Sequence, residues 1–238
     1  MEKINPGDIN RTNERLEAIS NMKRLDNPRD LYGILGREDA SEYFWHHPKW
    51  KEEILKYFRQ IHESGGKVVY VDICGQATGE NLGADQSYSF SFDAPKNKIK
   101  SSDSAVFVTG NIFKMEDVSR FLEVIKAGGT APALVTFNPI SAFDTYKPDI
   151  NLVRQDSTKR EFYIQKAIIY KKFEKVLKEV VDVIGEKSYV LFSPPFRYFE
   201  QPPELRAEVK KIAGKLNCEV EADPISTGED PDFLLRKK

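Results

Sequence analysis

Short apolar runs recur along the chain, each bounded by glycine, proline or polar residues. Such continuous runs are typical of strands that are buried on both faces, as in a parallel sheet. In the segment SYSFSFD, serine and aromatic residues alternate instead, which is also a strand pattern. The pattern predicts strands over residues 68–72, 87–93, 105–111, 131–138, 188–193, 218–222 and 233–236.

Longer segments carry apolar residues three and four positions apart, which predicts helices that pack one face on a core. These segments cover residues 11–25, 41–64, 115–127, 158–184 and 204–216. Strands and helices therefore alternate through much of the chain, which predicts an α/β fold with a doubly wound, mostly parallel sheet. The last two strands have only about ten residues between them, whereas a parallel crossover needs a dozen or more. They are expected to form an antiparallel hairpin at the carboxyl end.

The chain divides into a polar arm and one large domain. Residues 1–40 are polar and interrupted by glycine and proline, so we expect an N-terminal arm. Residues 41–238 carry all the predicted strands and are long enough to bury a substantial core.

Composition narrows the class of protein. The net charge is −1, which does not indicate a nucleic-acid-binding protein, although a nucleic-acid substrate stays possible. Two cysteines are too few for a disulfide framework, and no apolar run reaches the length of a membrane span. We therefore expect a soluble, cytoplasmic protein with no membrane partner. His46 and His47 have no acid or cysteine at ligand spacing, so they are interpreted as packing or surface residues and no metal is expected.

Candidate chemistry begins at the end of the first predicted strand. Asp72 ends that strand, and a loop with Gly75, Gly79 and Gly83 follows. Ligands of open α/β sheets bind outside the carboxyl ends of the strands. A carboxylate followed by glycines, which let a backbone approach closely, suits a nucleoside-bearing cofactor.

Residues at four predicted strand ends resemble motifs of the class I S-adenosylmethionine-dependent methyltransferases, whose seven-stranded sheet ends in such a hairpin. Asp72 with its glycine loop is similar to the first motif, and Asp93 to the acid after the second strand. Gly110-Asn-Ile-Phe113 is similar to the Gly-Asp-Ile-Phe segment after the third strand. Phe137-Asn-Pro139 occupies the place of the motif after the fourth strand.

The resemblance implies S-adenosylmethionine as the cofactor and a Rossmann-like methyltransferase fold. It implies that Asp93 binds the ribose hydroxyls and that Asn138 orients the methyl acceptor. The remaining implied cofactor residues are Asp72, Gly75, Gly79, Asn111, Ile112 and Phe137. The acceptor is not identified, and RNA and small molecules both remain open.

Departures from the family pattern keep two alternatives open. Ala77 and Thr78 stand where the FtsJ-type ribose methyltransferases have proline and glycine, and Ser193 stands where they have a lysine. One alternative is a methyltransferase-like binding or scaffold domain without catalysis. The other is an NAD(P)-dependent reductase, because the three glycines loosely resemble those of short-chain reductases.

Overall fold

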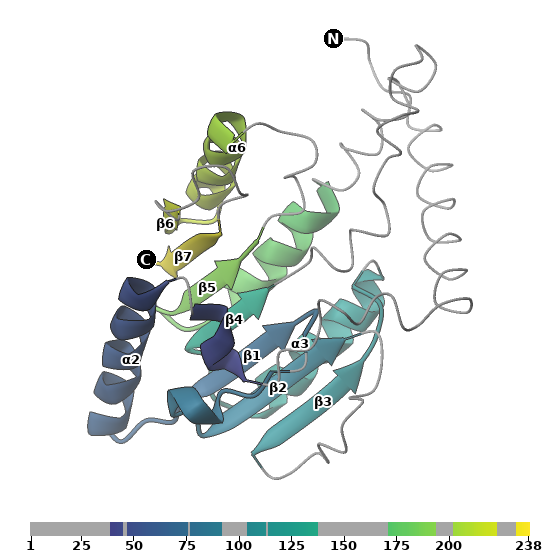
Figure 1. The fold of residues 1–238 in the computed structure, drawn as a ribbon. Helices are drawn as coiled ribbons and strands as arrows, with labels where there is room; N and C mark the ends of the chain where they lie inside the picture. The colour runs from purple at the N-terminus through teal and green to yellow at the C-terminus, as the bar shows by residue number, and fades with distance from the viewer. Residues whose placement is uncertain are drawn as a thin grey trace, which may run out of the picture.

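The computed structural model describes residues 39–44, 47–75, 77–91, 104–112, 114–137, 171–193, 202–222 and 232–238. These contain a seven-stranded sheet in the order β3-β2-β1-β4-β5-β7-β6 (Figure 1). Strands β1 to β5 are parallel, and β7 is antiparallel to β5 and β6. The predicted doubly wound, mostly parallel α/β sheet with a C-terminal hairpin is therefore confirmed. The strands are β1 (Val69–Ile73), β2 (Gln86–Ser91), β3 (Ala105–Thr109), β4 (Leu134–Phe137), β5 (Tyr189–Phe192), β6 (Cys218–Ala222) and β7 (Phe233–Lys237).

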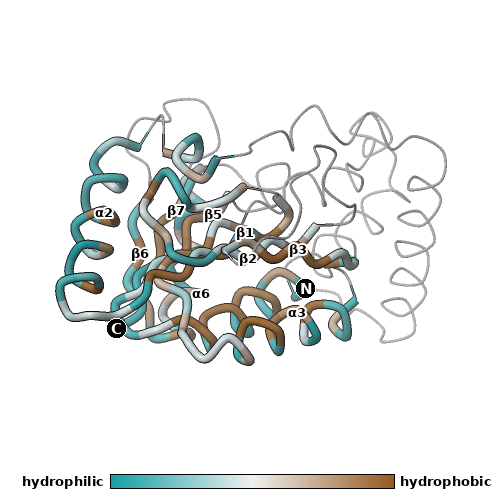
Figure 2. The backbone as a smooth tube through the Cα atoms, turned by 90° about the horizontal axis from the view of Figure 1, so that it is seen from below, coloured by the Kyte–Doolittle hydropathy of each residue, from teal (hydrophilic) through white to brown (hydrophobic). Residues whose placement is uncertain are grey.

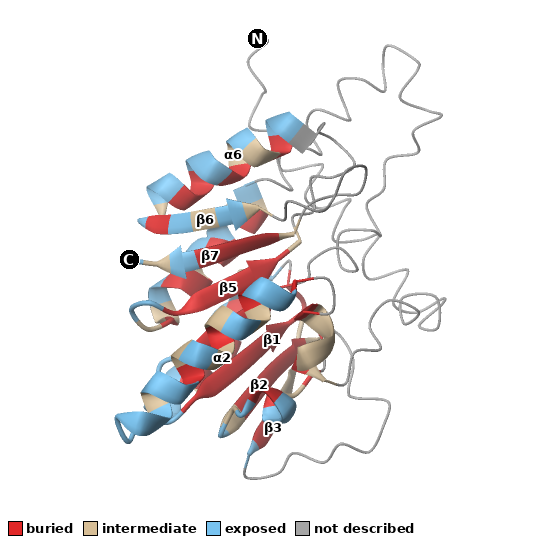
Figure 3. Cartoon of the chain, turned by 60° about the vertical axis from the view of Figure 1, so that its left-hand side comes forward, coloured by how far each residue is buried: buried red, intermediate tan, exposed pale blue. Residues whose placement is uncertain are grey.

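Helices cover both faces of the sheet. On one face lies α2 (Pro48–Glu63), which turns its buried side toward the strands and its exposed side outward (Figure 3). On the other face lie α3 (Met115–Ala127), the helical residues 171–183 and α6 (Pro202–Lys215). Each face has its own apolar core, and the apolar residues concentrate in the strands and on the inner sides of the helices (Figure 2). The central strands β1, β4 and β5 are thus buried on both faces, as their continuous apolar runs predict.

The helix predicted over residues 41–64 is two elements in the structure. A 3-10 helix, η2 (Ala40–Phe44), comes first, and α2 begins only at Pro48. Proline lacks an N–H and keeps the residue before it out of the helical region, so it fits the first turn of a helix. His47 accordingly has φ −128° and ψ 57°, and it is the N-cap of α2.

The described residues between β1 and β2 form no α-helix; they contain a short 3-10 helix, η3 (Glu80–Leu82). Side chains of β2 hold this link against the sheet. Gly79 N–H donates to Ser87 Oγ at 2.9 Å, and Ser89 Oγ–H donates to Ala77 O at 3.1 Å. The serines of the alternating pattern therefore bind the link, while the aromatic residues between them enter the opposite core.

Most predicted elements have slightly different bounds in the structure. The strand predicted over 131–138 begins at Leu134, and the helix predicted over 204–216 begins at Pro202. Residues 1–38, with the predicted helix 11–25, lie outside the described residues, so the division at residue 40 stays a prediction. Within the described ranges, no helix is long and apolar enough to cross a membrane.

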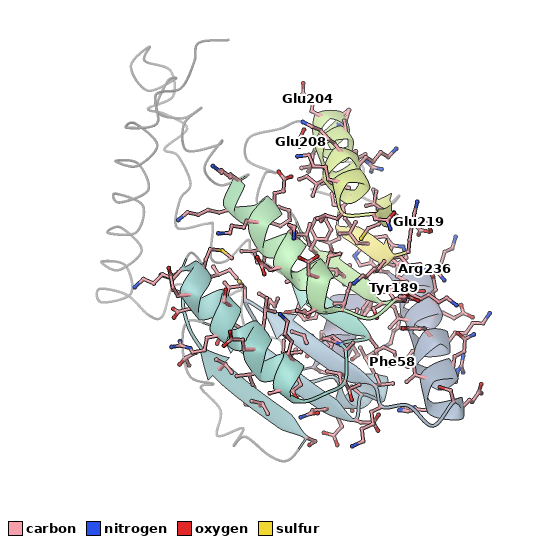
Figure 4. The ribbon with its side chains drawn as sticks, turned by 180° about the vertical axis from the view of Figure 1, so that it is seen from behind. Phe58, Tyr189, Glu204, Glu208, Glu219 and Arg236 are labelled. Carbon is pink, nitrogen blue, oxygen red and sulfur yellow. The ribbon has the colours of Figure 1, made fainter. Side chains whose placement is uncertain are left out.

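Tyr189 joins α2 to the sheet at the amino end of β5 (Figure 4). Its hydroxyl donates to Glu53 Oε1 at 2.7 Å, and the Arg236 guanidinium lies 5.8 Å from its ring centroid. Burial, and then the hydrogen bond to Glu53, raise the pKa of Tyr189 above its usual value. Tyr189 is therefore a neutral hydrogen-bond donor that fixes this end of α2.

We expect Lys237→Met to destabilise the protein by about 1.5–3 kcal/mol, the range for hydrogen bonds to charged groups. Lys237 Nζ donates to the carbonyls of Val181 at 2.8 Å and Ile184 at 2.9 Å, at the end of the helix over 171–183. Methionine keeps the apolar stem but leaves these carbonyls without their cationic donor. Urea denaturation measures the change.

Lys215→Met is the matched control for this prediction. Lys215 Nζ pairs with Glu174 Oε1 at 2.6 Å, but both side chains are exposed. An exposed ion pair contributes about 0–1 kcal/mol. Equal losses in the two variants would show that Lys237 does not cap the helix.

Candidate functional site

The carboxyl ends of β1, β4 and β5 lie side by side at one edge of the sheet. Ile73 pairs with Phe137, and Phe137 pairs with Phe192, so the three strands end at the same level. The three strands are therefore neighbours in the sheet. In open α/β sheets this edge is where ligands bind, next to the point where the strand order reverses. Here the order reverses at β1, between β2 and β4.

Asp72 is the centre of a buried hydrogen-bonded array at this edge. Its side chain is fully buried, and Oδ2 accepts the Ala77 N–H at 2.8 Å. Its Oδ1 accepts the hydroxyl of Thr136 at 2.8 Å and that of Tyr43 at 3.1 Å. The carboxylate thus joins β1, β4, the glycine loop and η2.

Tyr70 extends the array on the α2 side of the sheet. Its hydroxyl lies 2.5 Å from Thr136 Oγ1, and its side chain is fully buried. Burial, and then the negative charge of Asp72, raise the pKa of Tyr70 well above its usual value. Tyr70 therefore stays a neutral phenol and cannot serve as a base.

Gly75 leaves no room for a side chain beside Asp72. A Cβ at Gly75 would lie 2.1 Å from Asp72 Oδ2. Gly75 is buried, and its backbone N–H has no acceptor among the described residues. Buried amides of this kind are rare in proteins without a bound partner. This N–H is therefore a candidate donor for a ligand at the β1 tip.

Gly79 lets the link between β1 and β2 lie directly on the sheet. A Cβ there would meet Tyr70 Cβ at 2.7 Å and Ala84 Cβ at 2.8 Å. Both neighbouring atoms are fixed by the backbone, so neither can move away easily. Gly79 is therefore required for packing, whatever contact it makes with a cofactor.

Cys74 has no catalytic chemistry in this setting. Its φ is 67°, and its N–H donates to Phe90 O at 2.8 Å, which turns the chain away from β1. Burial, and then the charge of Asp72, raise the pKa of the Cys74 thiol far above its usual range. The thiol is therefore protonated and unreactive. The described ranges also contain no group of three histidine, cysteine or acidic residues that could hold a metal ion.

The end of the predicted arm packs on the glycine loop. Asp39 forms a β-bridge with Thr78, and Ala40 N–H donates to Thr78 O at 2.9 Å. The side chain of Asn81 donates to Asp39. Together with the Tyr43 hydroxyl, these contacts fix η2 over the loop that follows β1.

Asn111 and Ile112 lie at the end of β3, where the sequence predicts the adenine site. Both residues are buried. The Asn111 N–H donates to Asp117 Oδ2 at 2.8 Å, and the Gly110 N–H donates to Ser91 O at 2.9 Å. The turn is thus anchored to β2 and to the first turn of α3, and its role at adenine stays a prediction.

Phe137 lies at the end of β4 with its side chain in the core. It is 1% exposed, and its ring stacks on Phe173 with centroids 5.5 Å apart. Its role in cofactor binding stays a prediction. Asp93 and Asn138 lie outside the described residues, so their roles also stay predictions.

Tyr43 and Thr136 are functional-site residues that the sequence analysis missed. They stand 29 positions before and 64 positions after Asp72, so no local spacing connects them. The one available signal is Thr136 itself, a hydroxyl inside the apolar run of β4.

Comparison with known proteins gives matches in structure only. No family model matches the sequence, and no curated protein matches it. The magnesium protoporphyrin IX methyltransferase ChlM from Synechocystis PCC 6803, with bound SAM, is similar at TM-score 0.48 and 11% identity, covering 94% of this chain and 97% of that one. The plantazolicin methyltransferase BpumL, in complex with a triazolic desmethylPZN analog and SAH, is similar at TM-score 0.42 and 10% identity, covering 98% of this chain and 99% of that one. A protein from Streptococcus thermophilus described as a hemolysin is similar at TM-score 0.42 and 13% identity, covering 78% and 66%.

These TM-scores are below 0.5, so the fold is assigned from the topology of the sheet instead. Its features are five parallel strands, a reversal of strand order at β1, and a terminal antiparallel hairpin formed by β6 and β7. Of these features, the mostly parallel sheet and the terminal hairpin are the ones that the sequence predicts. The chain has the Rossmann-like fold of the class I S-adenosylmethionine-dependent methyltransferases.

Proposed function

We propose that the protein is an S-adenosylmethionine-dependent methyltransferase. The observation that carries the proposal is the buried Gly75 N–H, which has no acceptor among the described residues and lies at the tip of β1. A carboxylate is the strongest acceptor for such an amide, and the methionine end of the cofactor carries one. The amide stands beside the switch point of the sheet, where nucleotide cofactors bind in this type of fold.

The residues around Gly75 fit the cofactor through backbone rather than side-chain contacts. Asp72 is occupied by Ala77, Thr136 and Tyr43, so we assign it to shaping the loop. Asp93 is assigned to the ribose hydroxyls, and the turn at Asn111 and Ile112 to the adenine. Asn138, one residue beyond β4, is assigned to orienting the acceptor.

The cofactor supplies an electrophilic methyl group on a sulfonium. The protein's contribution is to bind, align and exclude water, because in-line displacement depends on the relative position of the reacting atoms. Tyr70 and Cys74 stay protonated through burial and do not act as bases. Any base must come from another residue or from the acceptor itself.

Calorimetric titration with S-adenosylmethionine and with NAD, in parallel, tests the proposal. Saturable binding of S-adenosylmethionine alone supports it. Binding of NAD alone would favour the reductase, and binding of neither would leave the scaffold alternative.

Asp93→Ala is expected to weaken S-adenosylmethionine binding about 10- to 150-fold, which corresponds to about 1.5–3 kcal/mol for a hydrogen bond to a charged group. The same titration measures it, with the melting temperature as a check on folding. Asp182→Ala is the control, because Asp182 is an exposed residue paired with Lys178. Unchanged affinity in folded Asp93→Ala would remove Asp93 from the site.

A binding or scaffold domain without catalysis is the second candidate. It is favoured by the engagement of Asp72 with the protein and by Ala77 and Thr78 at positions where related loops have proline and glycine. Under this alternative, the fold binds a partner or a nucleoside without methyl transfer. The acceptor of an active enzyme, RNA or a small molecule, stays open.

A further inference from the structure

Three side chains from distant parts of the sequence meet beyond the carboxyl end of β5. Ser193 follows β5, Asp232 precedes β7, and His47 is the N-cap of α2. His47 Nε2 lies 2.9 Å from Asp232 Oδ2, and the Ser193 hydroxyl donates to Asp232 Oδ1. We name this group the Asp232 cluster.

Neighbouring side chains fix the position of His47 in the Asp232 cluster. The His47 side chain is 5% exposed, and its ring stacks on Trp50 with centroids 4.5 Å apart. Trp50 Nε1–H in turn donates to Glu221 Oε2 at 3.1 Å. The orientation of the carboxylate is therefore fixed by buried or bonded neighbours, and does not depend on a freely moving side chain.

The Asp232 carboxylate is partly exposed and has no lysine or arginine partner among the described residues. The Asp232 side chain is 33% exposed, and no lysine or arginine pairs with it in the part of the chain that the structure describes. A carboxylate has about four lone-pair sites. Of the residues that the structure describes, His47 and Ser193 each occupy one site, on different oxygens, which leaves capacity for a further donor.

The arrangement does not fit a serine nucleophile. In a catalytic triad, the histidine lies between serine and aspartate and accepts the serine proton. Here Asp232 is the central residue, and Ser193 donates to Asp232 instead of to His47. The cluster therefore exposes the negative charge of Asp232 and does not activate the Ser193 hydroxyl as a nucleophile.

The Asp232 cluster shares its edge of the sheet with the proposed reaction site. Asp232 immediately precedes Phe233, which pairs with Phe192 of β5, and Phe192 pairs with Phe137 of β4. Two strand spacings, about 10 Å, separate the tip of β4 from the start of β7. That separation is suited to anchoring a part of the acceptor that does not react.

We propose that the Asp232 cluster binds an ammonium group of the methyl acceptor. This inference rests on the proposed function, because the acceptor is what would bring the ammonium to this edge. A cationic N–H donor makes a stronger hydrogen bond to a carboxylate than a neutral donor does. The bound ammonium is an anchoring group; the methylated atom lies nearer β4.

The test is an NMR titration that follows the indole N–H signals. The chain has two tryptophans, and Trp45→Phe leaves the Trp50 signal alone. The probes are 1,4-diaminobutane and its neutral counterpart 1,4-butanediol. We expect the diamine to shift the Trp50 signal saturably, with a millimolar Kd, and the diol to leave it unchanged. Absence of a saturable shift up to about 50 mM diamine, far above a millimolar Kd, would overturn the proposal.

Asp232→Asn should weaken diamine binding tenfold or more, because the amide keeps the shape and loses the charge. Glu221→Gln is the matched control, since Glu221 is another carboxylate bonded to Trp50, and it should bind the diamine as the wild type does. Equal weakening in both variants, or in Glu221→Gln alone, would overturn the assignment to Asp232. The melting temperature of each variant verifies the fold.

Titration with S-adenosylmethionine separates this proposal from the proposed function. Cofactor binding without diamine binding overturns the ammonium site and leaves the methyltransferase assignment in place. Diamine binding at Asp232 without cofactor binding supports the ammonium site and contradicts the methyltransferase assignment.

Discussion

Asp72→Ala should lower the free energy of unfolding by about 3–5 kcal/mol, because each buried donor left without an acceptor costs about 1–3 kcal/mol. The substitution removes the acceptor of the Ala77 N–H, of the Thr136 hydroxyl and of the Tyr43 hydroxyl. Urea denaturation with extrapolation to water measures the loss.

Tyr43→Phe is the control for Asp72→Ala. It removes one partly exposed donor and leaves the carboxylate in place, so the expected cost is about 0.5–1.5 kcal/mol. If Asp72→Ala cost no more than Tyr43→Phe, the carboxylate would not be the centre of the array.

Gly75→Ala should lower stability by about 2–4 kcal/mol, since the displaced carboxylate would leave buried donors unsatisfied. The added Cβ would lie 2.1 Å from Asp72 Oδ2 and 2.7 Å from Asp72 Cγ. Under the proposed function, the same change moves the Gly75 N–H and should abolish measurable S-adenosylmethionine binding. Denaturation and calorimetry give the two readouts.

Gly214→Ala is the matched control for Gly75→Ala. Gly214 lies in α6, and a Cβ there meets nothing within 4 Å. Alanine in a helix is favoured over glycine by up to about 1 kcal/mol, so this variant should be slightly more stable than the wild type. A Gly75→Ala protein as stable as Gly214→Ala would show that the loop accommodates a side chain.

The sheet was predictable because the apolar runs carry the strand signal directly. The hairpin of β6 and β7 follows from the short distance between the last two runs, and the structure confirms it. Pro48 suits the first turn of α2 or a break near its start, but nothing in the sequence shows that a separate 3-10 helix precedes it. The serines of β2 bind the link between β1 and β2, which folds back onto the sheet. The alternation of serine and aromatic residues does not reveal this contact.

The site was predictable only where the chemistry is local in sequence. Asp72 and its glycines are adjacent, and the structure brings Asp72, Gly75 and Gly79 to one strand end. The partners Tyr43 and Thr136 come from other elements and need the fold to be known. His47 was interpreted as a packing or surface residue; it is buried against Trp50, but its bond to Asp232 joins residues 185 positions apart.

The serine contacts that hold the link between β1 and β2 also have a kinetic consequence. They are single hydroxyl–backbone bonds, each contributing about 1 kcal/mol, whereas the strands beneath are held by many ladder bonds. Local opening of the link should therefore be far more frequent than unfolding of the sheet. Each opening would separate Gly79 and Ala77 from Ser87 and Ser89, and would also break the bonds of Ala77 to Asp72 and of Thr78 to Ala40. The residence time of a molecule bound at this loop would then depend on how often these few bonds open together.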